Sequence, residues 1–397
     1  MTPSGSKRLL FVVNDASFFL SHRLPVALAA RAHGYDVQIA TPAGPGVDGI
    51  RAADLDWHCI RLSRSGRNPA REARTVADLC ALYRRLRPAL VHHVTPKPVL
   101  YGTAAARLTR VPAVVNAISG MGHVFADGST RRAAGLRALV SAGYGAALRH
   151  PRMRVIFQNA DARAEFLSRG WVRADEAVLV RGSGVDVTVF TPASSPPPHA
   201  PPLVVLTARL LFTKGVQEFV GAASLLRDAG VAARFALVGA TDPDNPASVP
   251  SRTLAEWGER GIVELWGHRE NMVDVFQAAQ VACLPSYLEG LPKALIEAAA
   301  CGLPIVTTDV PGCREVVRHG VNGLLVPPRD SFALASAVET LLDAPVLRRR
   351  FGEAGRRIAE AEFSEQLVVR QTMGIYRELL GERWPARPAA AAHAVAV

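Results

Sequence analysis

The stretch Val281-Ala-Cys-Leu-Pro-Ser-Tyr-Leu-Glu289-Gly-Leu-Pro-Lys-Ala-Leu-Ile-Glu297 contains a short apolar run, a turn and the start of a helix. The run Val281–Leu284 predicts a buried strand, because it is short, apolar and bounded by turn residues. Pro292 is favoured in the first turn of a helix, which predicts a helix over Lys293–Cys301. A strand, a loop and a helix in this order are the repeating unit of a parallel sheet with right-handed crossovers. The stretch therefore predicts an α/β fold.

The same rhythm continues on both sides of this stretch. In the second half of the chain the further expected strands are Leu203–Thr207, Arg234–Val238, Val263–Trp266, Ile305–Thr307 and Gly323–Val326, and the further helices are Val216–Asp228, Ser251–Arg260, Asn271–Ala279 and Ser331–Leu342. In the first half the expected strands are Arg8–Val13, Val37–Ala40, Leu90–Val94, Ala113–Ala117 and Val155–Gln158, with a helix at His22–His33. Two doubly wound sheets are therefore expected.

A Pro-rich segment separates the two series of elements. Residues 191–202 hold six prolines, a density that neither a helix nor a central strand tolerates. We therefore expect a Rossmann-like domain over residues 1–190, a linker over 191–202 and a second domain over 203–383, facing each other across a cleft. The last helix is expected to cross back to the first domain, and the Ala/Pro-rich residues 384–397 to be a frayed tail.

Charge divides the chain at the same place. The 397 residues carry a net charge of +11, but residues 1–190 hold 26 Lys and Arg against 13 Asp and Glu, whereas residues 191–397 hold 20 against 22. A basic half indicates an anionic partner, such as nucleic acid, a phosphorylated substrate or an anionic lipid surface. A nucleic-acid partner is disfavoured, because aromatic residues make up only 6% of the chain and no recognition motif accompanies the charge.

Several other classes are disfavoured by patterns that the sequence lacks. No apolar run reaches the ~18 residues that span a bilayer. The apolar residues after Lys7-Arg8 are short and run into Asn14-Asp15, which indicates a first strand rather than a signal peptide. The five cysteines are scattered, which is typical of a protein in a reducing cytosol and provides no metal framework.

Two loops of the second half carry groups suited to a sugar and a diphosphate. In the first, Gly290 permits close backbone approach to a ligand, and the free N–H groups of the following helix favour a phosphate. Glu289 is placed to accept hydrogen bonds from sugar hydroxyls, and Glu297, expected about two turns into the helix, to chelate a ribose diol. In the second loop, Arg209 and Lys214 follow the strand Leu203–Thr207 and would clamp a diphosphate. A solvated acid and an exposed basic loop are the ordinary alternatives.

At this point the residues carry a family resemblance. Arg209 and Lys214 followed by Glu289-x7-Glu297 resemble the motifs of the retaining glycosyltransferases of family 4, which have the GT-B fold. The resemblance runs along almost the whole chain and includes Ser183-Gly-Val-Asp186, Trp266-Gly-His-Arg-Glu270, Thr308-Asp-Val-Pro-Gly-Cys-Arg-Glu315 and Asn322-Gly-Leu-Leu-Val-Pro327. Phe-Leu-Ser-His22-Arg23 and His92-His-Val-Thr-Pro-Lys97 are similar to a branch that acts on polyprenyl-diphosphate sugars. The loop after the first strand lacks the Gly-Gly pair that much of the family has.

The resemblance implies roles for individual residues. Arg209 and Lys214 would hold the donor diphosphate, which agrees with the need to stabilise a leaving diphosphate. The main-chain groups of Gly290, Leu291, Pro292 and Lys293 would touch sugar and phosphate, Glu297 the ribose and Arg269 the base. His123, in the loop Ser119-Gly-Met-Gly-His123, would lie near the reacting sugar. His22, Arg23 and Lys97 are candidates for the acceptor; a packed turn histidine and a solvated lysine are alternatives for His123 and Lys97.

The family resemblance further implies that no metal or other cofactor is needed. Two D-x-D sequences, Asp54-Leu-Asp56 and Asp242-Pro-Asp244, are present, but we expect both to lie away from the Arg209, Lys214 and Glu289 cluster and to bind no metal.

The basic stretch Arg61–Arg87 is a candidate for membrane contact. Helical spacing places Arg67, Arg71 and Arg74 on one face, and with Arg64 they would bind anionic headgroups at roughly 1 kcal/mol per residue. A solvated helix face is the alternative.

The sequence thus predicts a metal-independent, retaining glycosyltransferase at the cytoplasmic face of the membrane, peripherally bound. It would move a hexose or N-acetylhexosamine from a nucleotide sugar, most simply a UDP-sugar, to a polyprenyl-diphosphate-linked or other glycan acceptor in cell-surface polysaccharide assembly. Another GT-B enzyme, such as a nucleotide-sugar epimerase, and a non-catalytic GT-B binding scaffold are the alternatives.

Overall fold

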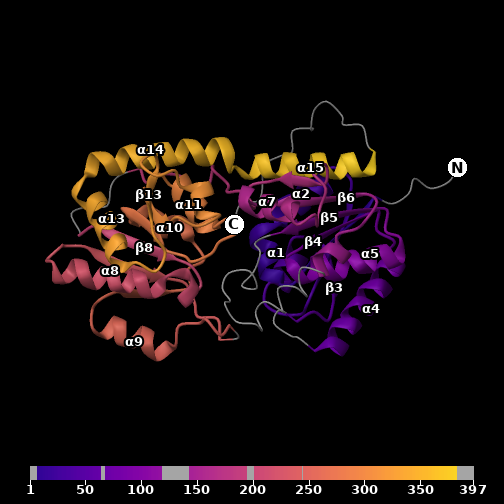
Figure 1. Cartoon of the computed structure of the whole chain (residues 1–397), viewed down its shortest axis with the longest axis horizontal. Helices are drawn as coiled ribbons and strands as arrows, with labels where there is room; N and C mark the ends of the chain where they lie inside the picture. The colour runs from indigo at the N-terminus through magenta and orange to yellow at the C-terminus, as the bar shows by residue number, and fades with distance from the viewer. Residues whose placement is uncertain (1–6, 64–67, 119–142, 195–200, 244, 382–397) are drawn as a thin grey trace. The chain divides into compact units, whose positions relative to one another are not determined.

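A computed structural model describes residues 7–63, 68–118, 143–194, 201–243 and 245–381. The chain forms two compact units, residues 1–180 with 368–397 and residues 181–367 (Figure 1). The division between them falls after Val180, so the segment expected as a linker, 191–202, belongs to the second unit, and its residues 195–200 are outside the described ranges.

The first unit is built on a parallel sheet of seven strands in the order β3-β2-β1-β4-β5-β6-β7. The strands are β1 (Arg8–Val13), β2 (Asp36–Thr41), β3 (Asp56–Cys59), β4 (Leu90–Val94), β5 (Ala113–Ile118), β6 (Met153–Phe157) and β7 (Ala177–Leu179). Its helices are α1 (Ala16–His22), α2 (Leu24–Ala32), α3 (Val47–Ala52), α4 (Pro69–Leu86), η1 (Pro98–Gly102), α5 (Thr103–Thr109) and α7 (Ala160–Ser168).

The second unit has a parallel sheet of six strands in the order β10-β9-β8-β11-β12-β13. The strands are β8 (Leu203–Thr207), β9 (Arg234–Val238), β10 (Glu264–Gly267), β11 (Val281–Leu284), β12 (Ile305–Thr308) and β13 (Gly323–Val326). The helices are η2 (Phe212–Lys214), α8 (Val216–Asp228), α9 (Ser251–Glu259), α10 (Met272–Ala278), α11 (Lys293–Ala300), α12 (Cys313–Val316), α13 (Ser331–Asp343) and α14 (Pro345–Glu362).

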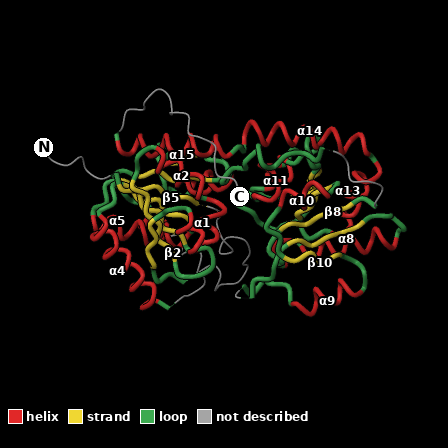
Figure 2. The backbone as a smooth tube through the Cα atoms, turned by 180° about the vertical axis from the view of Figure 1, so that it is seen from behind, coloured by secondary structure: helices red, strands yellow, loops and turns green. Residues whose placement is uncertain are grey.

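Helices cover both faces of each sheet (Figure 2). In the first unit, alternate residues of β1 enter different cores: Leu9 and Phe11 pack with α1, α2 and α3, and Leu10 and Val12 pack with α4 and α5. Because both faces are covered, the central strands are almost wholly apolar and buried. This explains why short apolar runs identified the strands well.

The last helix, α15 (Glu365–Leu380), extends from the second unit into the first. Val368, Met373 and Tyr376 are buried in the core of the first unit, and the Tyr376 hydroxyl lies 2.5 Å from Nδ1 of His92 on β4. Contacts between residues so far apart in sequence leave no local pattern, so only the direction of this helix could be expected from the sequence.

The elements expected from the sequence differ from the structure at one helix of the first unit and at two edge strands. The helix expected over His22–His33 is α2, which is slightly shorter at both ends, whereas α1, which ends at His22, was not predicted. The edge strands β3 and β7 were not predicted, because β3 is polar and partly exposed and β7 has only three residues. Among the described residues, no helix is both long enough and apolar enough to cross a membrane.

Candidate active site

The candidate donor residues gather where the six-stranded sheet changes direction. From β8 the chain adds β9 and β10 on one side, and β11, β12 and β13 on the other. In open α/β sheets the crevice at this switch point, outside the carboxyl ends of the two central strands, is the usual ligand site. Arg209 and Lys214 follow β8, and Ser286 and Glu289 follow β11.

Gly215 allows the two loops to meet. Its φ is +73°, and a Cβ atom there would lie 2.1 Å from the carbonyl oxygen of Pro285. Only glycine fits so close to backbone at this φ. A main-chain hydrogen bond from Tyr287 N to Thr213 O, 3.0 Å long, joins the loops as well. The Gly215 position therefore fixes the spacing between Lys214 and the loop that carries Glu289.

Lys214, Glu289 and Ser286 form one polar cluster. Lys214 Nζ donates to Glu289 Oε1 at 2.5 Å, and Ser286 Oγ donates to the same oxygen at 2.6 Å. The Glu289 side chain is only 9% exposed and that of Lys214 21%, so each depends on the other for compensation of its charge. Among the described residues, nothing donates to the second carboxylate oxygen of Glu289. Ser286 was missed in the sequence, where it appeared only as a strand terminus.

Arg209 is paired with Asp242, which the sequence had placed elsewhere. Arg209 Nη1 donates to Asp242 Oδ2 at 2.5 Å, and the Arg209 side chain remains 49% exposed. The expectation that Asp242 lies away from the cationic cluster was wrong, because β8 and β9 are neighbours and their carboxyl ends meet. Asp244 lies outside the described residues. Asp54 and Asp56, the other D-x-D pair, are in the first unit and contact Arg31 and Gln38.

Helix α11 begins at Lys293, as expected, with Pro292 as its N-cap and no side-chain cap. Glu297 is therefore just over one turn into the helix, not two. It is 8% exposed and accepts a hydrogen bond from Lys293 Nζ at 2.6 Å, so it is a buried, paired carboxylate rather than a surface acid.

Two glycines hold the Glu289 loop from the other side. Gly312, after β12, has a φ of +84°, and a Cβ there would lie 2.6 Å from Gly290 O and 2.7 Å from Glu289 O. Gly182 has a φ of +72°, and its Cβ would lie 2.7 Å from a methyl group of Leu291. The loop therefore depends on distant residues for its position, a role that local sequence does not reveal.

Aromatic and cationic side chains lie on either side of the central strands. Arg269 follows β10, is exposed and lies 5.9 Å from the ring of Trp266. On the other side, Arg329 lies 4.7 Å from the ring of Tyr287, whose hydroxyl donates to Glu218 at 2.6 Å. Burial, together with this hydrogen bond, raises the pKa of Tyr287, so the phenol stays protonated.

In the first unit, some of the candidate acceptor-binding residues lie near the surface and one is buried. Lys97 follows β4, the strand next to β1 where this sheet changes direction, and pairs with Glu72 at 2.8 Å. His22 stacks on Phe18, with ring centroids 4.0 Å apart. Arg23, in contrast, is 4% exposed, and burial lowers its pKa to about 10. His123 lies outside the described residues.

The candidate membrane residues are only partly described. Arg71 and Arg74 are exposed on α4, whose first residue is Pro69. Arg64 and Arg67 lie outside the described residues. Arg61 is bound to the carboxylate of Asp78 by hydrogen bonds of 2.8 and 2.9 Å.

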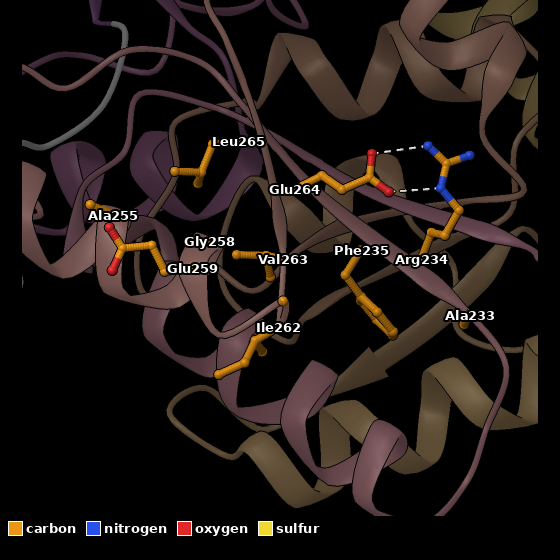
Figure 3. A pocket seen from close by; sticks show the side chains of 11 residues that line it. Ala233, Arg234, Phe235, Ala255, Gly258, Glu259, Ile262, Val263, Glu264 and Leu265 are labelled. Atoms are coloured by element: carbon orange, nitrogen blue, oxygen red, sulfur yellow. Dashed lines mark hydrogen bonds and ion pairs between the residues drawn. The ribbon is translucent and has the colours of Figure 1, made fainter.

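A surface pocket of about 550 Å³ lies elsewhere in the second unit (Figure 3). It is lined by the amino ends of β9 and β10, where Arg234 binds both carboxylate oxygens of Glu264 at 2.7 and 2.9 Å. The amino ends of parallel strands are opposite the ends that carry Lys214 and Glu289, so this pocket is separate from the candidate donor site.

Two family models match the chain, one in each half. Residues 8–148 match the model described as glycosyl transferase 4-like, and residues 201–344 match glycosyl transferases group 1. The chain belongs to the GT-B glycosyltransferases. The α/β fold with two doubly wound sheets, and the family resemblance read from the spaced motifs, are thus confirmed.

This glycosyltransferase is similar along nearly its whole length to a lipid-linked sugar transferase. The N,N'-diacetylbacillosaminyl-diphospho-undecaprenol alpha-1,3-N-acetylgalactosaminyltransferase of Campylobacter jejuni is 24% identical over 384 residues, which are 94% of this chain and 99% of that protein. The putative colanic acid biosynthesis glycosyltransferase WcaL of Escherichia coli is 32% identical over 219 residues, about half of each chain, at 51% and 52%.

Solved structures agree on the fold. A glycosyltransferase from Rickettsia africae has a TM-score of 0.74 at 17% identity and covers 96% of this chain and 100% of its own. Anabaena HepE, solved with UDP-glucose, has a TM-score of 0.73 at 18% identity and covers 94% and 99%.

Proposed function

We propose that this GT-B glycosyltransferase transfers a hexose or an N-acetylhexosamine from a UDP-sugar to a polyprenyl-diphosphate-linked glycan. The observation that carries the proposal is the Lys214, Glu289 and Ser286 cluster at the switch point of the second sheet. The name of the Campylobacter relative and the UDP-sugar in the Anabaena neighbour support the choice of acceptor and base.

The donor diphosphate is proposed to bind between Arg209 and Lys214. Arg209 has five N–H donors and uses Nη1 for Asp242, so others are available at its exposed edge. The ammonium group of Lys214 has three donors and gives one to Glu289. Both cations would neutralise charge as the nucleoside diphosphate leaves, which is where such sites contribute most to rate.

The sugar and the ribose are proposed to bind the two acidic side chains. The second carboxylate oxygen of Glu289 would accept a hydrogen bond from a hydroxyl of the donor sugar, while the first is held by Lys214 and Ser286. Glu297, near the start of α11, would accept the ribose hydroxyls, and the main chain of Gly290 to Lys293 would contact the phosphate. Arg269 would frame the base beside Trp266.

The transfer is proposed to retain the anomeric configuration without a metal ion. The bond from the anomeric carbon to the diphosphate oxygen breaks, and the acceptor hydroxyl oxygen bonds to that carbon on the same face. The hydroxyl proton passes to the leaving diphosphate. Arg209 and Lys214 would supply the positive charge that a metal supplies elsewhere, and His123 would lie beside the reacting sugar.

The acceptor is proposed to bind the first unit from a membrane surface. Lys97 follows the carboxyl end of β4, and His22 ends α1, the helix that follows β1. Lys97 would contact the acceptor diphosphate after exchange of its Glu72 partner. Peripheral binding to the cytoplasmic face through Arg64, Arg67, Arg71 and Arg74 would present the lipid-linked glycan. Four Arg→Gln changes at these positions should reduce sedimentation with anionic vesicles, and unchanged sedimentation would remove the membrane part of the proposal.

The test of the donor assignment is a thermal-shift and turnover panel of UDP-, GDP- and TDP-sugars. A UDP-sugar should raise the melting temperature and be consumed only when a lipid-diphosphate glycan is added, without added metal. Consumption of donor with release of an isomeric nucleotide sugar would indicate an epimerase instead. Binding without any turnover would indicate a non-catalytic scaffold. A response to GDP- or TDP-sugars alone would contradict the assignment of UDP as the donor nucleotide.

A further inference from the structure

A second hollow, in the first unit, is lined by three arginines. Its volume is about 640 Å³, and it lies where α4 and α5 end and β4 and β5 begin. Arg84 and Arg87 come from the end of α4, and Arg110 from the end of α5. Tyr83, Pro88, Ala89, Thr109, Val111 and Pro112 complete the lining.

None of the described residues that line this hollow is acidic. Among the described residues, none of Arg84, Arg87 and Arg110 has a carboxylate within ion-pair distance, and all three are exposed. Nearby cations differ in this respect, because Arg8 is paired with Asp36 and Arg61 with Asp78. Three uncompensated guanidinium groups around a concave surface create a local positive potential that favours an anion.

The backbone at two of these arginines is unusual. Arg87 has a φ of 49° and Arg110 a φ of 56°, so both are in the left-handed region at the end of a helix. Glycine is the common residue there, because a Cβ atom is strained in this conformation. The carbonyl groups at a helix end attract a cation, which accounts in part for an arginine at each of these two positions. They do not account for two non-glycine residues whose side chains both line one hollow.

The floor of the hollow is firm and contributes no competing charge. The Tyr83 hydroxyl is directed away into the core, 2.9 Å from Nε2 of His93, and Val111 O lies 3.0 Å from Nε2 of His150. The arginines are therefore the groups that a ligand would meet. Guanidinium groups bind phosphate oxygens in pairs, which suits a tetrahedral phosphate better than a single carboxylate.

We propose that Arg84, Arg87 and Arg110 form a binding pocket for a phosphate group at the amino ends of β4 and β5. This pocket is distinct from the acceptor candidates, because Lys97 follows the carboxyl end of β4 and a strand of this length spans about 16 Å. It is also distinct from the candidate donor residues, which belong to the second unit. The phosphate group can belong to a soluble phosphorylated metabolite or to a lipid headgroup.

The test uses the full chain with the double change Arg87→Gly and Arg110→Gly. Glycine is the residue most at ease at both φ values, so the fold should be kept while two cations are removed. The matched control is Arg349→Gln with Arg357→Gln, two exposed arginines on α14 in the other unit. Arg84→Gln is a third variant that leaves the helix ends unchanged. All carry Lys214→Ala to weaken pyrophosphate binding at the donor site.

Two probes distinguish the source of the phosphate. Inorganic pyrophosphate is titrated by calorimetry, and vesicles of phosphatidylglycerol with phosphatidylcholine are tested by sedimentation. The glycine variant should lose about tenfold or more in affinity for one probe, since each contact to a charged group is worth about a factor of ten. The Arg84→Gln variant should also lose affinity for that probe, and the α14 control should keep its affinity.

Each outcome decides the proposal. Loss with pyrophosphate assigns the pocket to soluble phosphates, and loss with vesicles alone assigns it to headgroups. Equal loss in the α14 control would reduce the effect to net charge and overturn the pocket. Unchanged binding in both arginine variants would also overturn the pocket. The same holds if neither probe binds the protein that keeps these three arginines. None of these results depends on the donor sugar, so failure here leaves the proposed transfer reaction standing.

Discussion

Replacing Lys214 with Ala should destabilise the second unit as well as stop sugar transfer. The change leaves the Glu289 carboxylate, which is 9% exposed, with only the Ser286 hydroxyl as a donor to Oε1. Losing a hydrogen bond to a buried charged group costs about 1–3 kcal/mol. For a unit of 150–250 residues each kcal/mol lowers the melting temperature by about 2–4 °C, so a fall of about 2–12 °C is expected in a melting scan.

A double-mutant cycle separates the pair from its two members. Glu289→Gln alone leaves the Lys214 ammonium facing a neutral amide, and the double variant removes both charges. If the two groups compensate each other, the combined loss should be smaller than the sum by about 1–2 kcal/mol. The control cycle is Arg252 with Glu256, an exposed i,i+4 pair 3.0 Å apart in the same unit, for which about 0.3–0.5 kcal/mol is expected.

Transfer activity gives the second readout. Removing a group that stabilises the leaving diphosphate typically costs about 10²–10³ in turnover, so Lys214→Ala and Glu289→Gln should each nearly abolish transfer while the protein still melts cooperatively. A coupling energy no larger than that of the surface pair would refute the compensation argument. Full turnover with an unchanged melting temperature would refute the assigned roles altogether.

Three further results are expected. Gly312→Ala should lower transfer and stability together, because the new Cβ would strike the carbonyls of Glu289 and Gly290; normal turnover in a donor assay would show that the loop adapts freely. Burial lowers the pKa of His93 from 6.5 to about 4, so the unfolded chain binds the proton first and stability should fall as pH drops from 6.5 towards 4. His93→Gln should flatten that part of a melting-temperature profile, and an identical slope would contradict the assignment. Arg356→Ala should cost about 1–3 kcal/mol, because its guanidinium donates to three main-chain carbonyls; denaturant unfolding should show it, and a midpoint shift near zero would oppose it.

The sequence was most informative where structure is local. The strands Leu90–Val94, Leu203–Thr207 and Val281–Leu284 were predicted to the residue, because a strand buried on both faces is predominantly apolar, although Leu90–Val94 also contains His92 and His93. It was least informative at the sheet edges, where β3 has polar, partly exposed residues. Helix α1 (Ala16–His22) also escaped prediction, because the expected helix began only at His22 and the residues before it were expected to form the loop after the first strand.

For the site, the order of motifs along the chain was enough to identify the family and to select Arg209, Lys214, Glu289 and Glu297. The tertiary structure decided which groups these residues meet. Asp242 binds Arg209, and Gly312 supports the Glu289 loop, although both are far from their partners in sequence. Parallel strands bring their carboxyl ends to one edge whatever their separation along the chain, so such contacts follow from strand order and leave no local pattern.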